Sequence, residues 1–229
     1  MSFRKLLAVS ALTLVLTGCA TVTNLIPERA ETNYLSGRVG TNGPVLIAKI
    51  DDTTQAHPQI GIEDADVVYI EQVEGGLTRL AAIFSSIIPQ RVGPVRSARI
   101  SDIDIVAQYG HIAFAYSGAQ KKLLPVIAEA NLQDLGAQHQ GSSIYTTDPN
   151  RIPPYAMVLR ADLLMKKCIE KNYSIDKAKS IGWKFGELQE GGLPTSKVVM
   201  HWPAATYSAQ WSNSEKRWLL NHNNEVNFA

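Results

Sequence analysis

Charged side chains that could do chemistry gather in the segment RVGPVRSARISDID, residues 91–104. The segment holds three arginines and two aspartates around a Gly-Pro pair, whereas only 19% of the 229 residues are charged. The guanidinium group of arginine binds phosphate or carboxylate groups through two parallel hydrogen bonds. Carboxylates can act as general acids or bases. Three interpretations follow: an anion-binding site, a catalytic site, or an internal ion-pair brace.

A predicted hairpin just before this segment supplies further carboxylates. DVVYIEQV (66–73) is rich in β-branched and aromatic residues, and a Glu-Gly-Gly turn separates it from TRLAAIFSS (78–86). Cross-strand neighbours lie about 5 Å apart. Arg79 can therefore pair with Glu71 or Glu74, and we expect a Glu71–Arg79 ion pair because an unpaired buried charge costs several kcal/mol.

The two aspartates of the segment match a helix start. Ser101 followed by Asp104 fits the S-x-x-[DE] capping pattern ahead of an apolar run. Asp102 and Asp104 in a first helical turn would also suit the positive end of the helix dipole. We therefore expect Ser101 to cap a helix and the aspartates to begin it, and we do not expect an acid/base pair here.

The arginines have no such simple explanation. Arg96 and Arg99 come directly before the predicted helix start, after Gly93-Pro94. Cations beside exposed amide donors favour binding of phosphate or carboxylate. Direct catalysis is a further possibility.

The competing interpretation is structural. In it, the same two arginines reach inward to Asp51, Glu71 or Glu74 and lock the strands to the helix. Ser97 has no histidine nearby in the sequence, so we expect it to form hydrogen bonds and not to act as a nucleophile. The candidate ligand-binding residues are Arg79, Arg96, Ser97, Arg99, Glu71, Glu74 and Asp51.

The elements that must position these residues predict an α/β (α+β) fold with a mixed sheet. PVLIAKID (44–51) and HIAFAYS (111–117) have the continuous apolar character of buried strands. Helical spacing marks 125–132 and 161–172, and a polar, proline-rich loop spans 140–156. Together they predict an N-terminal α/β domain over residues 37–180.

Residues 181–229 predict a small antiparallel β-rich domain. SKVVMHWP, TYSAQWSN and KRWLLNHN are short aromatic segments separated by turn residues, which predicts three strands. We expect Trp202, Trp211 and Trp218 to be core anchors of this sheet, and the alternative is a tryptophan surface that binds sugar or a partner protein.

The N-terminus predicts a lipoprotein signal peptide over residues 1–18. A short basic start precedes an apolar run that is about half the ~20 residues needed to span a bilayer. Thr17 and Gly18 before Cys19 fit lipoprotein processing, so we expect a lipid on Cys19 and a tether over 19–36. This places the protein on the extracytoplasmic face of a membrane, with Cys168 as a buried thiol in a helix.

Composition argues against several classes of function. The chain has 22 basic and 21 acidic residues, and this near-neutral balance offers no field for binding nucleic acid. The five histidines show no paired ligand spacing, so no metal site is predicted. No P-loop, dinucleotide fingerprint or G-x-S-x-G elbow is present, and no cofactor is predicted.

Three motifs follow one another along the first half of the chain: His57-Pro58-Gln59 with Gly61 and Ala65-Asp66, Val73-Glu74-Gly75-Gly76 with Thr78-Arg79, and Val92-Gly93-Pro94-Val95-Arg96-Ser97 with Arg99. In these motifs the sequence resembles the YerB-like bacterial lipoproteins, a family defined as a domain of unknown function. This resemblance implies an extracytoplasmic protein with an α/β N-terminal domain and a smaller β-rich C-terminal domain, and no established activity. It also implies further strands after residue 229, so the second domain looks incomplete.

Two hypotheses for function follow. The first is a membrane-anchored, non-enzymatic binding or scaffold protein of the cell envelope, which holds an anion or an envelope partner at the arginines. The second is an enzyme acting on envelope polymers, with Glu71 or Glu74 as general acid/base.

Overall fold

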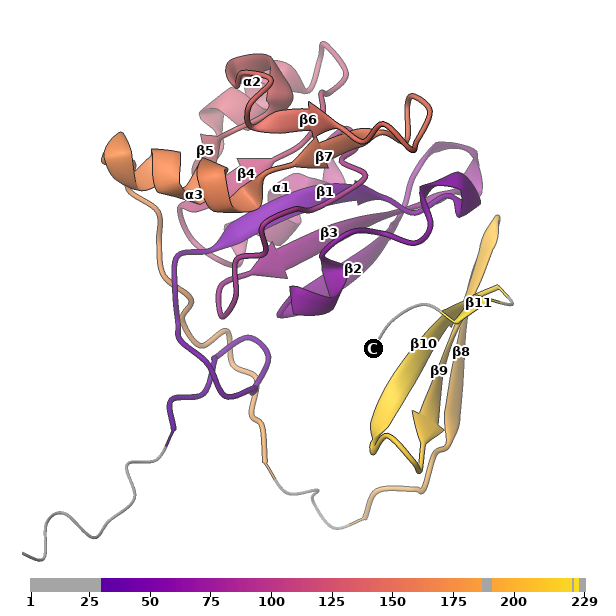
Figure 1. The fold of residues 1–229 in the computed structure, drawn as a ribbon. Helices are drawn as coiled ribbons and strands as arrows, with labels where there is room; N and C mark the ends of the chain where they lie inside the picture. The colour runs from indigo at the N-terminus through magenta and orange to yellow at the C-terminus, as the bar shows by residue number, and fades with distance from the viewer. Residues whose placement is uncertain (1–29, 187–190, 224, 227–229) are drawn as a thin grey trace, which may run out of the picture. The chain divides into compact units, whose positions relative to one another are not determined.

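The structure is a computed structural model that describes residues 30–186, 191–223 and 225–226 (Figure 1). The described residues from Thr32 onward belong to one unit by their contacts. The predicted signal peptide and Cys19 lie outside the described residues. Within the described part, the helices are all too short or too polar to cross a membrane.

A five-stranded mixed sheet with the order β2-β3-β1-β4-β5 forms the centre of the first half of the chain (Figure 1). The pairs β2–β3 and β3–β1 are antiparallel, whereas β1–β4 and β4–β5 are parallel. The strands predicted near 44–51, 66–73, 78–86 and 111–117 are therefore confirmed. The strands are β1 (Leu46–Asp51), β2 (Val67–Gln72), β3 (Thr78–Phe84), β4 (Ile112–Ala115) and β5 (Leu132–Asp134).

Helices cover both faces of this sheet. Helix α3 (Ala161–Glu170) packs with one set of alternating β1 residues, which includes Leu46 and Ile50. Helices α1 (Ser101–Ala107) and α2 (Leu124–Glu129) pack on the opposite face, which includes Ile47. Because both faces are covered, β1 is buried along its whole length, as its continuous apolar run predicts.

Two segments differ from the sequence prediction. The helix predicted over 125–132 ends at Glu129, because Ala130 is extended and the chain enters β5. The predicted loop over 140–156 contains strand β6 (Tyr145–Thr147), which pairs antiparallel with β7 (Met157–Leu159). Short 3-10 helices complete this part of the chain: η2 (Thr54–Ala56), η3 (Ile62–Asp64), η4 (Glu74–Gly76) and η5 (Ala137–His139).

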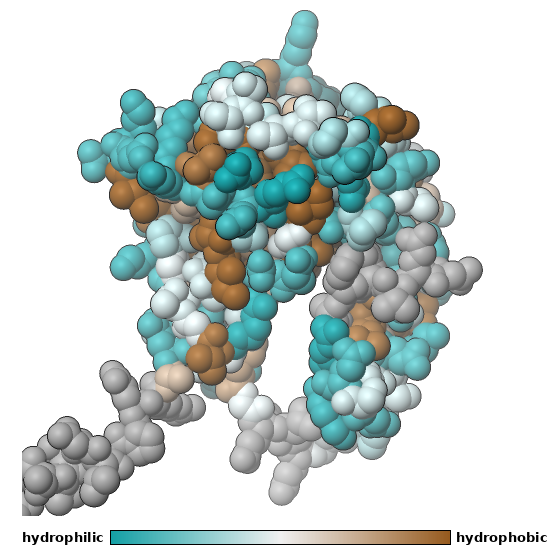
Figure 2. Space-filling view, in the orientation of Figure 1, coloured by the Kyte–Doolittle hydropathy of each residue, from teal (hydrophilic) through white to brown (hydrophobic). Residues whose placement is uncertain are grey.

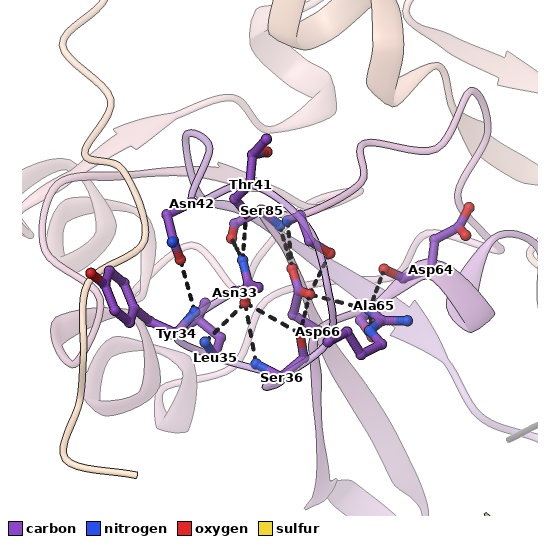
Figure 3. A network of polar contacts seen from close by, with 12 residues as sticks. Asn33, Tyr34, Leu35, Ser36, Thr41, Asn42, Asp64, Ala65, Asp66 and Ser85 are labelled. Atoms are coloured by element: carbon purple, nitrogen blue, oxygen red, sulfur yellow. Dashed lines mark hydrogen bonds and ion pairs between the residues drawn. The ribbon is translucent and has the colours of Figure 1, made fainter. Parts of the chain in front are cut away.

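A network of polar contacts fixes the chain before β1 to the β2–β3 pair (Figure 3). The Asp66 carboxylate accepts hydrogen bonds from the main-chain N–H groups of Ser85 and Ser86 at 2.7 and 2.8 Å. Asn33 donates to Ser85 Oγ at 2.8 Å, and Ser36 Oγ donates to Asp66 at 2.8 Å. Leu35 is buried in the core, so the last residues of the predicted tether belong to the folded unit.

The last part of the chain forms a four-stranded antiparallel sheet with the order β11-β10-β9-β8. Trp211 and Trp218 are cross-strand neighbours that form an edge-to-face pair with ring centroids 5.9 Å apart. They are 36% and 39% exposed, so the prediction that they are core anchors is wrong for this pair. The strands are β8 (Lys197–Trp202), β9 (Ala205–Ser212), β10 (Arg217–His222) and β11 (Glu225–Val226).

On the face drawn in Figure 2, hydrophilic residues predominate and hydrophobic residues form scattered patches. Cys168 is buried in α3, and burial raises the pKa of its thiol to about 11. This thiol is therefore protonated at neutral pH and behaves as a small apolar side chain.

Candidate anion-binding site

The sheet register brings three of the predicted site residues into one row. Arg79 at the start of β3 lies opposite Asp51 of β1 on one side and opposite Glu71 of β2 on the other. Side chains in such a row share one face of the sheet. The face is the one covered by α1, and the row lies at the end of the sheet where β1 and β2 finish.

Main-chain hydrogen bonds hold the arginine segment beside this row. The Asp51 N–H donates to the Pro94 carbonyl at 2.8 Å, and the Arg96 N–H donates to the Lys49 carbonyl at 2.9 Å. On the other side, the Ser117 N–H donates to the Arg96 carbonyl at 2.9 Å. The segment therefore lies between the ends of β1 and β4, where backbone contacts fix its position.

The guanidinium groups of Arg79 and Arg99 converge on one carbonyl oxygen. Arg79 Nη1 donates to the Ser97 main-chain oxygen at 3.0 Å, and Arg99 Nη1 approaches the same oxygen at 3.4 Å. Ser97 thus contributes its carbonyl to the site. Arg96 lies close enough to act on Arg79 electrostatically.

Arg79 is a half-buried cation that forms no ion pair with a described carboxylate, although the charges of Asp51 and Glu74 act on it. Burial and the positive charges of Arg99 and Arg96 lower the pKa of Arg79 to about 10. Among the described residues, no Asp or Glu oxygen lies within 4.0 Å of its guanidinium. The predicted Glu71–Arg79 ion pair is therefore wrong, although the two residues are cross-strand neighbours.

The other two arginines are paired, as the brace interpretation expects. Arg96 Nε lies 2.5 Å from an Asp51 oxygen, and its guanidinium lies over the Tyr155 ring at 5.8 Å from the centroid. Arg99 Nε and Nη2 each lie 2.8 Å from the same Glu74 oxygen. The hydrogen bond from Arg99 lowers the pKa of Glu74, whose side chain is 57% exposed.

Glu71 contacts Lys49 and Ser101, neither of which is among the candidate ligand-binding residues. Its Oε1 pairs with the buried Lys49 ammonium, and its Oε2 accepts a hydrogen bond from Ser101 Oγ at 2.5 Å. Lys49 also lies 2.7 Å from an Asp102 oxygen. The signal that could have identified Lys49 is its place as the single charged residue inside the apolar run PVLIAKI.

Ser101 does not cap helix α1, so that prediction is wrong. The helix begins at Ser101 with Ile100 in the cap position, and the Ser101 hydroxyl is used by Glu71. Asp102 accepts the Arg99 N–H at 2.6 Å through its second oxygen. Burial and the nearby Glu71 charge raise the pKa of Asp102, despite the opposing effect of Lys49.

The motif residues before β2 have a structural role around Asp52. This buried carboxylate accepts hydrogen bonds from Thr78 Oγ1 at 2.6 Å and Gln59 Nε2 at 3.1 Å. His57 Nε2 lies 3.3 Å from it. These contacts hold the loop after β1 against the end of the strand. They give the His57-Pro58-Gln59 segment a structural role that requires no ligand.

The arrangement suits anion binding better than proton transfer or metal binding. At the exposed end of the row, three arginines face the two carboxylates of Asp51 and Glu74, which leaves one positive charge in excess. Both Glu71 oxygens are engaged. Within residues 30–186, 191–223 and 225–226, no three His, Cys, Asp or Glu side chains come together as metal ligands.

Fold and site together define an α+β protein with an arginine cluster at one end of a mixed sheet, followed by an antiparallel sheet. Residues 32–174 match the family model described as "Protein of unknown function (DUF3048) N-terminal domain", and the chain belongs to this family. The resemblance to YerB-like lipoproteins is thus confirmed. The family description gives no activity.

Two comparisons with individual proteins agree. The chain is 31% identical over 143 residues to "Putative lipoprotein YerB" of Bacillus subtilis (strain 168), across 60% of this chain and 41% of that protein. The chain therefore matches less than half the length of that relative. It also resembles the crystal structure of the YerB protein from Bacillus subtilis, with a TM-score of 0.70 and 20% identity over 86% of this chain and 68% of that one.

Proposed function

We propose that this protein is a lipid-anchored, extracytoplasmic binding protein of the cell envelope that holds a phosphate or carboxylate group at Arg79, Arg96 and Arg99. The observation that carries the proposal is the state of Arg79. Its guanidinium is half-buried beside two other cations, and among the described side chains no carboxylate pairs with it. An anion would neutralise this excess charge and accept the remaining N–H donors.

The carboxylates of the site position the arginines. Asp51 holds Arg96, which also lies over Tyr155, and Glu74 holds Arg99. Arginines held in this way lose little conformational freedom when a ligand binds, which favours affinity. Glu71 acts further back, through Lys49 and Ser101.

The alternative function is an enzyme acting on envelope polymers, with Glu71 or Glu74 as general acid/base. Such a residue must be within reach of a substrate proton. Glu71 is buried with both oxygens engaged, and the Glu74 carboxylate contacts Arg99 and Gln120. These contacts favour the binding protein over the enzyme.

Titration calorimetry of the full chain in detergent with inorganic phosphate, at low ionic strength, tests the anion site. We expect Arg79→Gln to weaken phosphate binding at least tenfold, since charge-assisted hydrogen bonds contribute about 1.5–3 kcal/mol. Arg160→Gln is the matched control, because Arg160 pairs with Asp162 outside the cluster. Unchanged phosphate affinity in Arg79→Gln, together with a lower melting temperature, would show that the cluster is a brace.

The lipid anchor on Cys19 is supported by the name of the Bacillus subtilis relative, a putative lipoprotein. Two acyl chains on this residue would suffice for stable attachment, at about 0.8 kcal/mol for each buried methylene. We expect Cys19→Ser to move the protein from the detergent phase to the aqueous phase, while Cys168→Ala leaves it in the detergent phase. If the Cys19→Ser protein remained in the detergent phase, the lipid anchor would be refuted.

A further inference from the structure

A cavity of about 310 Å³ opens beside Arg99, at the edge of the arginine cluster. This volume lies at the lower end of the range of about 300–1,000 Å³ for small-molecule sites. The lining residues come from the turn after β2, the two residues before α1, and the segment that leads into α2 together with Val126 of that helix. They combine charged and apolar side chains.

One wall is polar and carries an excess of positive charge. It contains Arg99 and Lys122, together with Glu74, which accepts from Gln120 Nε2 at 3.2 Å as well as from Arg99. Lys122 and Glu74 are exposed. Glu74 precedes two glycines with φ of 70° and 73°, a left-handed backbone that glycine adopts without strain.

The rest of the lining is apolar and largely open to solvent. Ile100 and Val126 line it with 65% and 38% of their surfaces exposed. Buried Leu123 completes this apolar wall. Large aliphatic side chains beside a charged cavity lose water when an apolar group binds there, which is a source of affinity that a bare phosphate ion cannot use.

We propose that this cavity binds the alkyl chain of an anionic amphiphile whose head group lies on Arg99 and its neighbouring arginines. The proposal rests on the proposed function, because the head group uses the same anion site. It adds the class of ligand, which is an alkyl phosphate or a fatty carboxylate. Either the whole alkyl chain or a segment of it would fill the cavity. Each methylene that enters the cavity raises affinity about fourfold.

Calorimetry with methyl phosphate and hexyl phosphate, below the concentration at which the latter self-associates, tests the proposal. The two esters share a head group and differ only in chain length. We expect the full chain to bind hexyl phosphate at least tenfold more tightly than methyl phosphate. Equal affinities for the two esters would overturn the amphiphile proposal and leave the anion site intact, whereas absence of binding by both would overturn the proposed function as well.

Variants of the apolar residues that line the cavity test where the alkyl chain of the ligand binds. We expect Ile100→Asn and Val126→Asn to remove most of the preference for hexyl phosphate and to leave methyl phosphate affinity unchanged. Ile169→Asn is the control, since Ile169 is 73% exposed on α3 and does not line this cavity. A preference that survives in both wall variants would show that the chain binds elsewhere and would overturn the assignment.

A vesicle experiment distinguishes a membrane lipid from a free amphiphile. The Cys19→Ser protein is sedimented with phosphatidylcholine vesicles, with and without phosphatidic acid. Sedimentation that requires phosphatidic acid, and that Val126→Asn removes, supports a lipid of the bilayer as the source. A preference for hexyl phosphate without sedimentation supports a free amphiphile.

Discussion

The Lys49 ammonium lies 2.7 Å from an Asp102 oxygen in the interior of the protein, and it also pairs with Glu71. One buried cation thus serves two buried carboxylates that come from different elements, β2 and α1. The contact joins the sheet to the helix that follows the arginine segment. It stabilises the framework on which the candidate anion site depends.

Removal of Lys49 should be strongly destabilising. Lys49→Met leaves Glu71 and Asp102 as buried like charges, and loss of one partner of a buried ion pair costs about 3–5 kcal/mol. Urea unfolding measures the change in free energy. Lys166→Met, in an exposed pair on α3, should change the same quantity by less than about 0.5 kcal/mol. A small effect of Lys49→Met would contradict the buried triad.

The pH dependence of stability should report on Asp102. Burial and the Glu71 charge raise the pKa of Asp102 above its ordinary value of 3.8, so the folded protein holds this proton more tightly than the unfolded chain does. The stability contributed by Asp102 is therefore fully present below pH 3.8 and is lost as pH rises through the raised pKa.

Asp102→Asn removes this dependence. We expect the melting temperature of the variant, relative to the unchanged protein, to rise as pH increases from about 4 to 7. Melting curves in matched buffers measure the difference. Parallel pH profiles for the two proteins would show that Asp102 is not held in this state.

Asp66 should contribute stability in the opposite pH range. Burial alone would raise its pKa, but hydrogen bonds from Ser86, Ser36 and Ser85 outweigh burial and lower the pKa below 3.8. The contribution of Asp66 is therefore present above pH 3.8 and lost as pH falls below it.

Asp66→Asn should lower the free energy of unfolding by about 2–4 kcal/mol at pH 7, because two main-chain N–H groups lose a charged acceptor. Urea unfolding measures this loss. Asp64→Asn is the control, since Asp64 contributes its main-chain oxygen to Arg38 and no side-chain bond to this network (Figure 3). Equal effects of the two variants would contradict a special role for Asp66.

Glu74 should compete with a bound anion for Arg99. Glu74→Gln keeps an oxygen that can accept from Arg99 but removes a negative charge from the rim of the site. Two unit charges 4 Å apart in water interact by about 1 kcal/mol, so phosphate affinity should rise roughly fivefold. Calorimetry with phosphate measures this change. Weaker binding in Glu74→Gln would mean that the charge itself is needed to hold Arg99.

Much of the fold follows from local patterns along the chain. Residues 46–51 are all buried, and the charged members Lys49 and Asp51 form ion pairs. The alternation of side chains in 67–72 places Glu71 on the same face of the strand as Tyr69. Such periods indicate buried and half-buried strands without knowledge of their neighbours. The strand over 145–147 was not predicted, because three residues in a proline-rich segment are too few to show an alternation of apolar and polar side chains.

The sequence by itself predicted a cluster of Arg79, Arg96 and Arg99, and it predicted Glu71 and Arg79 as neighbours on facing strands, which the register of β2 and β3 confirms. Only the tertiary structure decided the pairing. Lys49 comes from β1 and pairs with Glu71, and Arg79 forms no ion pair with a carboxylate in the described part of the chain. The physical reason is that pairing of buried charges depends on distance and desolvation in three dimensions, and neither is a property of sequence spacing.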